Sequence, residues 1–570
     1  MKSFFSIVCI TFLLVPTVLA QTETSSKKRD AIDKLMQHSY DYDIFNGTIL
    51  VTQDGKEIYA NALGYADKNN KRKLNTTTMV YLASVSKQFT TMAVMLLKEQ
   101  NKLSYDDPLS QYFPEFPEYA NTVTIRHLMT HTSGIPDHYR LGAYKPGLTN
   151  KDVYNLLVKQ PLDFEPGERF SYSNGGYVLL AMIVAKVADQ PFHEFMKAHI
   201  FEPLGMKNTL VYDESNPTIK DRAVGYNAEG DLDDYTIFTT GAGGMFSTIH
   251  DLHLWDQALY TETLVSKATL NEAFTPAKLN NGDYTQYGFG WGIDEQDGKK
   301  SVQHSGGLAG YRTFLRRNLY DNSGYIILTN HGNQSNLTPI RRALDAILAN
   351  APYDLPRVPI STKLSKLLDA YDAKTAIIKA NELLLADSEK YEIDEYGINA
   401  LGYAYFGDGD FETTLAIFEF NVEKNPKASN PYDSLGEVQL ASGDTIQAVK
   451  NYKKSYELDR SNTNAINVLK RIGVDTSKMT EAIDVAPEIL DQYVGVYELQ
   501  PNFTLTISRE DHRLFVQATG QGKLEAFAMS ENKFYNTLVD AQITFHKNDK
   551  GEVHALTLHQ NGDHNAPKIK

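Results

Sequence analysis

The stretch Ser84-Val85-Ser86-Lys87 leads into an apolar run over residues 89–97, so Ser84 is predicted to open a buried helix. At positions i and i+3 of that helix, the side chains of Ser84 and Lys87 project from one face. A helix N-terminus offers free N–H groups and partial positive charge, which favour an oxyanion. Burial lowers the pKa of a lysine, and a neutral Lys87 could then take the proton of Ser84.

The spacing Ser-x-x-Lys alone decides nothing, because it also occurs at residues 25–28 and 530–533. The first of these lies in a polar leader and the second between predicted strands. For this cluster alone, the better interpretation is structural, with Ser84 as a helix cap and Lys87 as a surface charge. A catalytic interpretation therefore depends on two further clusters along the chain.

The second cluster, Tyr172-Ser173-Asn174, lies between a turn at residues 165–167 and an apolar helix at 177–187. Loops held in this way often carry catalytic groups. Tyr172 could pass a proton to a leaving group, provided that cations lower its pKa from the usual value of about 10. Asn174 could bind an amide carbonyl of a substrate. The alternative is that Ser173 or Asn174 simply caps the helix, which is compatible with function.

The third cluster, His304-Ser305-Gly306-Gly307, ends a predicted strand over residues 301–304. Glycines there would let a substrate backbone lie against the strand edge. The N–H of Gly307 could complete an oxyanion hole together with that of Ser84. The alternative is a hairpin end with an exposed histidine.

Residues 25–350 alternate strands and helices around these clusters, which predicts one α+β domain. Residues 47–51 and 56–59 flank Asp54-Gly55, a hairpin signal. Residues 287–292 form a predicted glycine-rich strand that another surface approaches closely. A second hairpin joins residues 312–318 to 325–330. Since strands come from both ends of the domain, we expect an antiparallel sheet with helices on its faces.

Beyond a proline-containing linker, residues 360–475 are predicted to be an α-helical repeat segment. Similar residues recur 34 positions apart, as Leu401 and Leu435, Gly409 and Gly443, and Phe418 and Tyr452. This is the tetratricopeptide period, and stacked helix pairs of that kind offer a concave surface to a protein partner or to a neighbouring domain. The alternative is generic helical hairpins with chance spacing. Residues 485–570 carry short alternating strands, which predict a small all-β barrel or sandwich.

Residues 1–20 have the pattern of a secretory signal peptide, with Lys2, an apolar run and a small-residue cleavage site. An uncleaved anchor is the alternative, but the run is short and Pro16 interrupts it. Removal of this segment would also remove Cys9, the only cysteine, leaving no disulfide or catalytic thiol. We expect an exported bacterial protein, periplasmic or secreted, without a transmembrane anchor in its mature form. A net charge of -15 without a basic run argues against a nucleic-acid partner.

The three clusters together resemble the signature elements of class C β-lactamase-like serine hydrolases and low-molecular-weight penicillin-binding proteins, the peptidase S12 type. Residues 128–136, 241–245 and 287–291 resemble the same family, and the likeness covers about residues 30–350. The C-terminal strands resemble, more weakly, the lipocalin-like domain appended to some serine peptidases of this clan. The resemblance implies a β-lactamase/transpeptidase-like fold and no cofactor. It implies an acyl-enzyme on Ser84, proton transfer shared by Lys87 and Tyr172, and substrate orientation by Asn174 and His304.

One departure concerns His304, where typical β-lactamases and D,D-carboxypeptidases carry a lysine. A histidine is largely neutral at about pH 7, so it offers no permanent cation to a substrate carboxylate. An esterase or D-amino-acid peptidase therefore fits better than an efficient β-lactamase, with a small molecule or short peptide as substrate. We also expect the rate to depend on the ionisation of His304. The alternative function is a catalytically weak protein that binds or senses β-lactams or cell-wall fragments while its helical repeats recruit a partner.

His127 and His131 lie at positions i and i+4 of a predicted helix, as zinc ligands can. The pair lacks the glutamate of the His-Glu-x-x-His motif, and Gly134 and Pro136 end the helix at once. We therefore expect no metal site.

Overall fold

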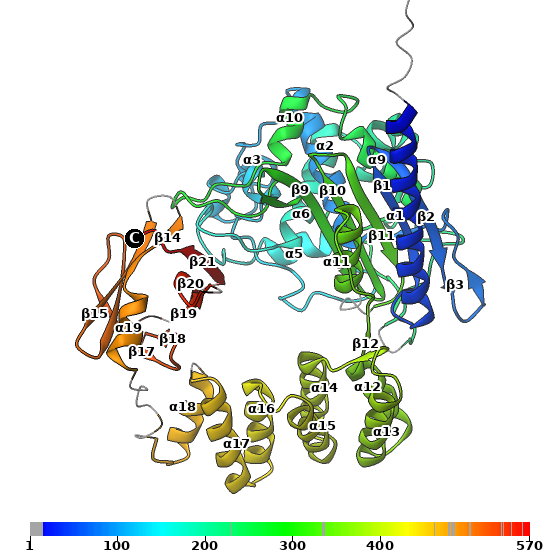
Figure 1. Cartoon of the computed structure of the whole chain (residues 1–570). Helices are drawn as coiled ribbons and strands as arrows, with labels where there is room; N and C mark the ends of the chain where they lie inside the picture. Colours follow the sequence, from blue (N-terminus) through cyan, green and yellow to red (C-terminus); the bar gives the residue numbers. More distant parts are fainter. Residues whose placement is uncertain are drawn as a thin grey trace, which may run out of the picture. The chain divides into compact units, whose positions relative to one another are not determined.

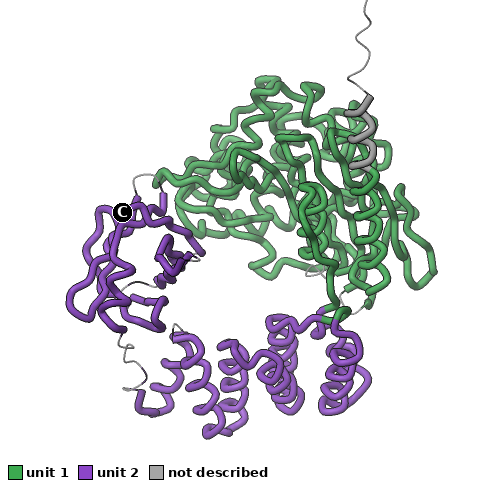
Figure 2. The backbone as a smooth tube through the Cα atoms, viewed as in Figure 1, with its two compact units in different colours: residues 1–358, 389–391 green, residues 359–388, 392–570 purple. Residues whose placement is uncertain are grey.

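The computed structural model describes residues 15–227, 230–332, 337–460, 462–476, 479, 485–500, 503–536, 539, 541–548, 550–560 and 562–570. The chain divides into two compact units (Figure 2). Unit 1 consists of residues 1–358 and 389–391, and unit 2 of residues 359–388 and 392–570. Unit 1 includes the whole predicted α+β domain. Unit 2 includes both the helical segment and the C-terminal strands, whose separation into two domains stays a prediction.

Unit 1 is built on a six-stranded antiparallel sheet in the order β2-β1-β11-β10-β9-β8. Asp54 and Gly55, with φ angles of 51° and 71°, form the tight turn between its first two strands, as the sequence predicts. The strands come from both ends of the domain: β1 (Gly47–Gln53), β2 (Lys56–Leu63), β8 (Gly292–Gln296), β9 (Lys299–Leu308), β10 (Tyr311–Asn318) and β11 (Ser323–Thr329). The predicted antiparallel sheet is thus confirmed.

Alternating side chains of this sheet belong to two separate hydrophobic cores, as expected when both faces of a sheet are covered. On one face, Ile49, Phe314 and Ile327 pack with α1 (Val15–Asp41) and α11 (Leu337–Leu348). Figure 1 shows these two helices over that face. On the other face, residues such as Leu50 and Leu315 join the largest core. That core also contains α2 (Lys87–Glu99), α6 (Asn174–Ala188) and α9 (Ile249–Ala258).

Residues 287–292 do not form the predicted strand. A single bridge joins Tyr287 to Gly292, and β8 begins only at Gly292. The reason is local: Gly290 has a φ of 77°, and the N–H of Gly288 donates to the carbonyl of Trp291, so the chain turns back. The predicted close approach is present, because a Cβ on Gly290 would lie 3.0 Å from the carbonyl oxygen of Lys87.

Unit 2 begins with paired helices. They are α12 (Ile360–Ala370), α13 (Ala373–Ala386), α14 (Glu395–Gly407), α15 (Phe411–Lys424), α16 (Ser429–Ala441), α17 (Thr445–Leu458) and α18 (Thr463–Arg471). The 34-residue period has a structural counterpart. Gly402 lies against the ring of Phe418, and Gly436 lies against the ring of Tyr452. The predicted helical repeat is confirmed, whereas its tetratricopeptide identity stays a prediction.

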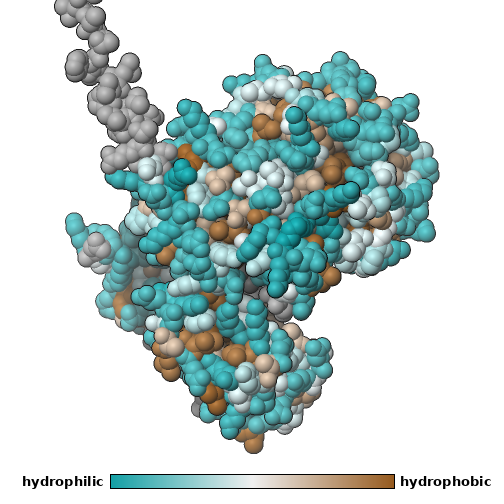
Figure 3. Space-filling model, turned by 90° about the vertical axis from the view of Figure 1, so that its right-hand side faces the viewer, coloured by the Kyte–Doolittle hydropathy of each residue, from teal (hydrophilic) through white to brown (hydrophobic). Residues whose placement is uncertain are grey.

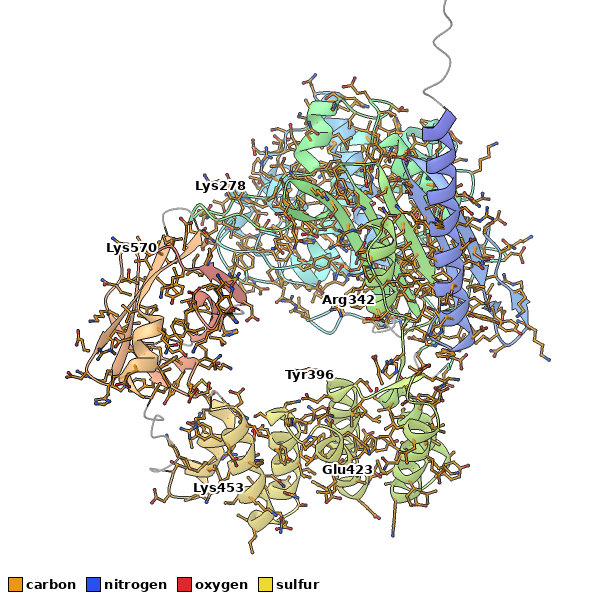
Figure 4. All side chains as sticks on the ribbon, viewed as in Figure 1. Lys278, Arg342, Tyr396, Glu423, Lys453 and Lys570 are labelled. Atoms are coloured by element: carbon orange, nitrogen blue, oxygen red, sulfur yellow. The ribbon has the colours of Figure 1, made fainter. Side chains whose placement is uncertain are left out.

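The helical segment carries several large apolar side chains at its surface. Leu385 and Tyr396 are 86% and 78% exposed, and Ile446 is 81% exposed. Hydrophobic residues gather in the lower part of the face shown in Figure 3, which this segment occupies. Figure 4 labels Tyr396 near the start of α14.

The C-terminal strands form an eight-stranded sheet that nearly closes on itself. The strands follow each other from β14 (Gly495–Gln500) to β21 (Asp563–Pro567) in sequence order. The two ends meet where the N–H of Val496 donates to the carbonyl of Lys570 at 2.8 Å and Ile569 donates to Val496 at 2.8 Å. Of the two predicted architectures, barrel and sandwich, the barrel is therefore correct. Its likeness to lipocalins stays a prediction.

The predicted signal peptide lies largely outside the described residues, because residues 1–14 are not among them. In the part of the chain that the structure describes, no helix has both the length and the apolar character needed to cross a bilayer.

We predict that Gly402→Ala destabilises unit 2 by about 1–3 kcal/mol. An added Cβ would lie 2.3 Å from Cε1 of the buried Phe418, so the ring must shift. Gly407→Ala, at the end of the same helix, meets nothing within 4 Å and serves as the control. Denaturant unfolding followed by circular dichroism measures both variants. Equal stabilities for the two would contradict the repeat contact.

Candidate active site

Ser84 lies in a short 3-10 turn, η1 (Ala83–Ser86), and Lys87 is the first residue of α2. This differs from the predicted helix start at Ser84. Ala83 has a φ of 48°, a conformation that costs energy in a non-glycine residue, and it turns the chain sharply before the serine. The turn leaves the serine and lysine side chains facing each other, with Lys87 Nζ 3.1 Å from Ser84 Oγ.

Lys87 is completely buried, and its amine has three oxygen neighbours. Besides Ser84 Oγ, Nζ lies 2.8 Å from Asn174 Oδ1 and 2.8 Å from the carbonyl oxygen of Ala242. Burial lowers the pKa of Lys87 to about 7, against the opposing effect of Asp137. A neutral amine has two N–H groups and one lone pair. If the N–H groups donate to the two carbonyl oxygens, the lone pair is left for the hydroxyl of Ser84.

Tyr172 and Asn174 come to the same place from the loop before α6. The ring centre of Tyr172 lies 4.9 Å from Lys87 Nζ. Burial raises the pKa of Tyr172, and a hydrogen bond with Ser84 opposes this only in part. The condition set for Tyr172, a pKa lowered by cations, is therefore not met, and the phenol stays protonated. Ser173 caps α6 by accepting from the N–H of Gly176, so the capping alternative is also correct.

His304 of β9 lies within the sheet edge as a neutral side chain. Its Nδ1 is 2.6 Å from the carbonyl oxygen of Ser305, which can only accept, so Nδ1 carries the proton. Nε2 then accepts from the hydroxyl of Tyr287 at 2.8 Å. Burial, and secondarily Lys87, lower the pKa of His304 to about 3. The ionisation predicted to control the rate thus falls far below neutral pH, and Lys87 is the group that titrates near pH 7.

The two glycines after His304 lie beside the turn that carries Ser84. A Cβ on Gly306 would lie 2.3 Å from the carbonyl oxygen of Leu82 and 2.3 Å from Thr313 Oγ1. Thr313 donates to that same carbonyl at 2.7 Å, which ties β10 to the turn. Gly307 follows on β9, opposite Arg312. All seven sequence-predicted site residues therefore belong to elements in contact with each other, while the oxyanion role of Gly307 stays a prediction.

Two residues of the site were not predicted. Asp137 receives hydrogen bonds from Asn174, and the carbonyl of Ala242 accepts from Lys87. Asp137 directly follows residues 128–136, and Ala242 lies within residues 241–245, two segments that resemble the family. Their roles had no signal of their own, because an aspartate after a turn and a backbone carbonyl are both ordinary features.

His127 and His131 lie in different local structures and make separate hydrogen bonds. His127 accepts at Nδ1 from the N–H of Thr124 and completes a capping box, whereas His131 lies beyond the helix α4 (Ile125–Met129) with a φ of 57°. His131 accepts instead from the N–H of Ser173 at 3.1 Å. Within the described ranges, no group of three or more metal-binding side chains occurs.

A cavity of about 250 Å³ adjoins the catalytic cluster at the edge of the sheet. Tyr172, Tyr287 and His304 line it from the side of the cluster. Ser305 and Arg341 also contribute to its wall. The cavity can take a small molecule or part of a short chain.

Comparison with known proteins agrees with this geometry. The Beta-lactamase family model matches residues 29–349, and a model described as a domain of unknown function, DUF3471, matches residues 480–568. A penicillin-binding protein of Bacillus subtilis (strain 168) is 36% identical over 361 residues, which span 59% of this chain and 79% of that protein.

Two solved structures share the fold. The octameric penicillin-binding protein homologue from Pyrococcus abyssi has a TM-score of 0.51 at 20% identity, over 94% of this chain and 99% of that one. The D-amino acid amidase from Ochrobactrum anthropi SV3 has a TM-score of 0.50 at 24% identity, over 57% of this chain and 98% of that one. The predicted β-lactamase/transpeptidase-like architecture is confirmed. Since the family match extends over more than half of the sequence, the chain belongs to the Beta-lactamase family.

Proposed function

We propose that this serine hydrolase cleaves esters or amides through an acyl-enzyme on Ser84. The observation that supports this most strongly is the position of Lys87: its buried amine lies 3.1 Å from Ser84 Oγ and contacts two carbonyl oxygens. With a pKa lowered to about 7, half of this amine is neutral at neutral pH and can act as a base.

In the acylation step, Lys87 takes the proton of Ser84 while Oγ forms a bond to the substrate carbonyl carbon. The negative charge that develops on the carbonyl oxygen is stabilised by the N–H groups of Ser84 and Gly307. When the carbonyl re-forms, the bond to the leaving group breaks. Tyr172 donates its proton to the leaving group and is reprotonated from the Lys87 ammonium. Water then attacks the acyl carbon and gives a proton to Lys87. The bond from that carbon to Ser84 Oγ breaks, the acid product leaves, and Lys87 passes the water-derived proton to Ser84 Oγ.

The charge of the site favours substrates without a carboxylate beside His304. This imidazole is neutral, is already hydrogen-bonded to Tyr287, and cannot act as a permanent cation. A neutral ester, or the amide of a D-amino acid, makes no demand for such a cation. An esterase or D-amino-acid peptidase is therefore the favoured activity, in which Asn174 and His304 orient the substrate.

Arg341 supports a second candidate, hydrolysis of a β-lactam or of a peptide with a free carboxylate. This side chain lines the cavity next to His304 and Ser305. Its guanidinium stacks on Phe314 at 3.9 Å, and its buried Nε makes no hydrogen bond within the described structure. A carboxylate entering the cavity could supply the missing acceptor. The relationship to a penicillin-binding protein at 36% identity agrees with this candidate.

The proposal also includes the location of the enzyme and its contact with a protein partner. The apolar residues that follow Lys2 favour export to the periplasm or the medium. The exposed apolar side chains of the helical repeat, such as Leu385 and Tyr396, favour contact with a protein partner.

Replacement of the nucleophile tests the proposal directly. We expect Ser84→Ala to abolish hydrolysis of p-nitrophenyl esters and covalent labelling by a fluorophosphonate or a fluorescent penicillin. Ser86→Ala, two residues along the same turn, should keep both, because Ser86 Oγ makes no hydrogen bond within the described residues. Labelling of the wild type without turnover would favour the binding or sensing alternative. Labelling of Ser84→Ala would contradict the proposal.

The pH dependence identifies the base. Protonated Lys87 cannot accept a proton, so kcat/KM for a neutral ester should fall about tenfold per pH unit below the Lys87 pKa of about 7 and level off above it. His304→Gln should leave the midpoint of this acidic limb in place, because His304 ionises far lower. If the acidic limb of kcat/KM shifts or disappears in His304→Gln, the titrating group is His304 and not Lys87.

The role of Arg341 is measured by comparing two ester substrates that differ by a carboxylate. Arg341→Ala should raise KM for the carboxylate-bearing ester about 10- to 100-fold, the loss expected for a charge-assisted hydrogen bond, and leave the neutral ester unchanged. Arg342→Ala is the matched control, since Arg342 is exposed on the same helix (Figure 4). Equal KM values for wild type and Arg341→Ala would remove the second candidate.

A further inference from the structure

Asp137 is a buried carboxylate directly behind the candidate active site. It is 5% exposed and receives three N–H groups. Its Oδ2 accepts from the backbone N–H of Asn174 at 2.8 Å and from Asn174 Nδ2 at 2.7 Å. Its Oδ1 accepts from the backbone N–H of Tyr139 at 2.8 Å. The carboxylate is thus held in one orientation by two backbone groups and faces one side-chain amide.

The consequence is that the Asn174 amide can point in only one direction. With Nδ2 donating to Asp137, Oδ1 faces Lys87 Nζ at 2.8 Å. In the flipped amide, Oδ1 would meet the carboxylate oxygen, so two acceptors would face each other without a proton. The N–H groups of the amide would then point at the lysine amine. The carboxylate of Asp137 therefore makes the flipped orientation of the Asn174 amide energetically unfavourable.

The direction of the amide decides where the Lys87 lone pair points. One N–H of the neutral amine donates to Asn174 Oδ1 and the other to the carbonyl of Ala242, leaving the lone pair for Ser84. The Ala242 acceptor is fixed by its backbone, because Thr90 donates to the neighbouring carbonyl of Gly241 at 2.8 Å. The Asn174 acceptor is a side chain and depends on Asp137. If Asn174 presented its NH2 group, the lone pair would be drawn to Asn174 and away from the serine.

Asp137 also supplies the charge that reaches Lys87. The other titratable groups around the amine are the imidazoles of His131, His138 and His304 and the phenols of Tyr172 and Tyr177. Burial lowers the pKa of each imidazole and raises the pKa of each phenol, so all five are neutral. Among the described residues, the attraction that favours the ammonium form of Lys87 therefore comes from Asp137.

We propose that Asp137 is a positioning residue which, through the Asn174 amide, directs the lone pair of Lys87 at the Ser84 hydroxyl. This inference rests on the proposed function of Ser84 and Lys87. Asp137 contacts neither the nucleophile nor the base, and acts on both through one amide group.

An exchange of the two side chains tests the proposal. Asp137→Asn permits the flipped amide and should lower kcat for a neutral ester about 10- to 100-fold. The acidic limb should move to lower pH, because the ammonium loses its counter-charge. Asn174→Asp places two carboxylates against each other and should also be impaired. In the double variant, the new amide at position 137 can donate to the new carboxylate at position 174, whose other oxygen faces Lys87.

The double variant should therefore recover part of the kcat lost in Asp137→Asn. The recovery is not complete, because the NH2 group at position 137 also faces the backbone N–H of residue 174. Its acidic limb should lie above that of the wild type, because a carboxylate now contacts the amine. A merely structural role of Asp137 predicts no such recovery. Asp251→Asn is the matched control: Asp251 is a buried carboxylate that accepts from the N–H of Asn208 and from Thr209, outside the site. Thermal unfolding of all variants separates activity from folding.

Two results would overturn the inference: Asp137→Asn with wild-type kcat and an unshifted limb, or a double variant no better than either single one. Failure of the proposed function is distinguished by Ser84→Ala. If that variant keeps its activity, the nucleophile is wrong. If it loses activity while Asp137→Asn behaves as wild type, only the role of Asp137 falls.

Discussion

The structure depends at its centre on the burial of one amine. Lys87 has no exposed surface, and its three neighbours come from the turn before α2, the start of α6 and residues 241–245. An ammonium there would lose its hydration without a directly bonded carboxylate, which is costly. The fold therefore lowers the proton affinity of this group while holding it beside a hydroxyl. The packing that buries Lys87 is therefore also what lowers its pKa and allows it to act as a base.

The side chains that directly surround Lys87 keep its pKa low because they carry no negative charge. His131, His138 and His304 are buried and neutral, as is the phenol of Tyr172. A permanent cation at position 304 would push the pKa of Lys87 lower still, by like-charge repulsion. The histidine instead completes a neutral hydrogen-bond chain with Tyr287. Within the described ranges, the negative charge that acts on the amine is that of Asp137. The Asn174 amide separates the two groups, so Asp137 favours the ammonium form without forming an ion pair.

Much of the architecture could be predicted from local patterns. Asp54-Gly55 predicted a hairpin, strands at both ends of the domain predicted an antiparallel sheet, and the 34-residue spacing predicted a helical repeat. The predictions that failed concern features that depend on tertiary contacts. The turn at Ala83 depends on strands that come more than 200 residues later, and the pKa directions of Tyr172 and His304 depend on burial, which single residues do not reveal. The contact of Asp137 with Asn174 could not be predicted, because it forms only where the loop packs against the start of α6.

The recurring glycine-to-ring contact in unit 2 has a bearing on how the chain can change over time. The contact of Gly436 in α16 with Tyr452 in α17 repeats that of Gly402 in α14 with Phe418 in α15, so both helical hairpins are closed in the same way. Duplication or loss of one complete 34-residue module would keep each glycine in the same hairpin as its ring. The spacer before the barrel can thus lengthen or shorten in whole steps, whereas a partial insertion would leave a ring without its matching glycine.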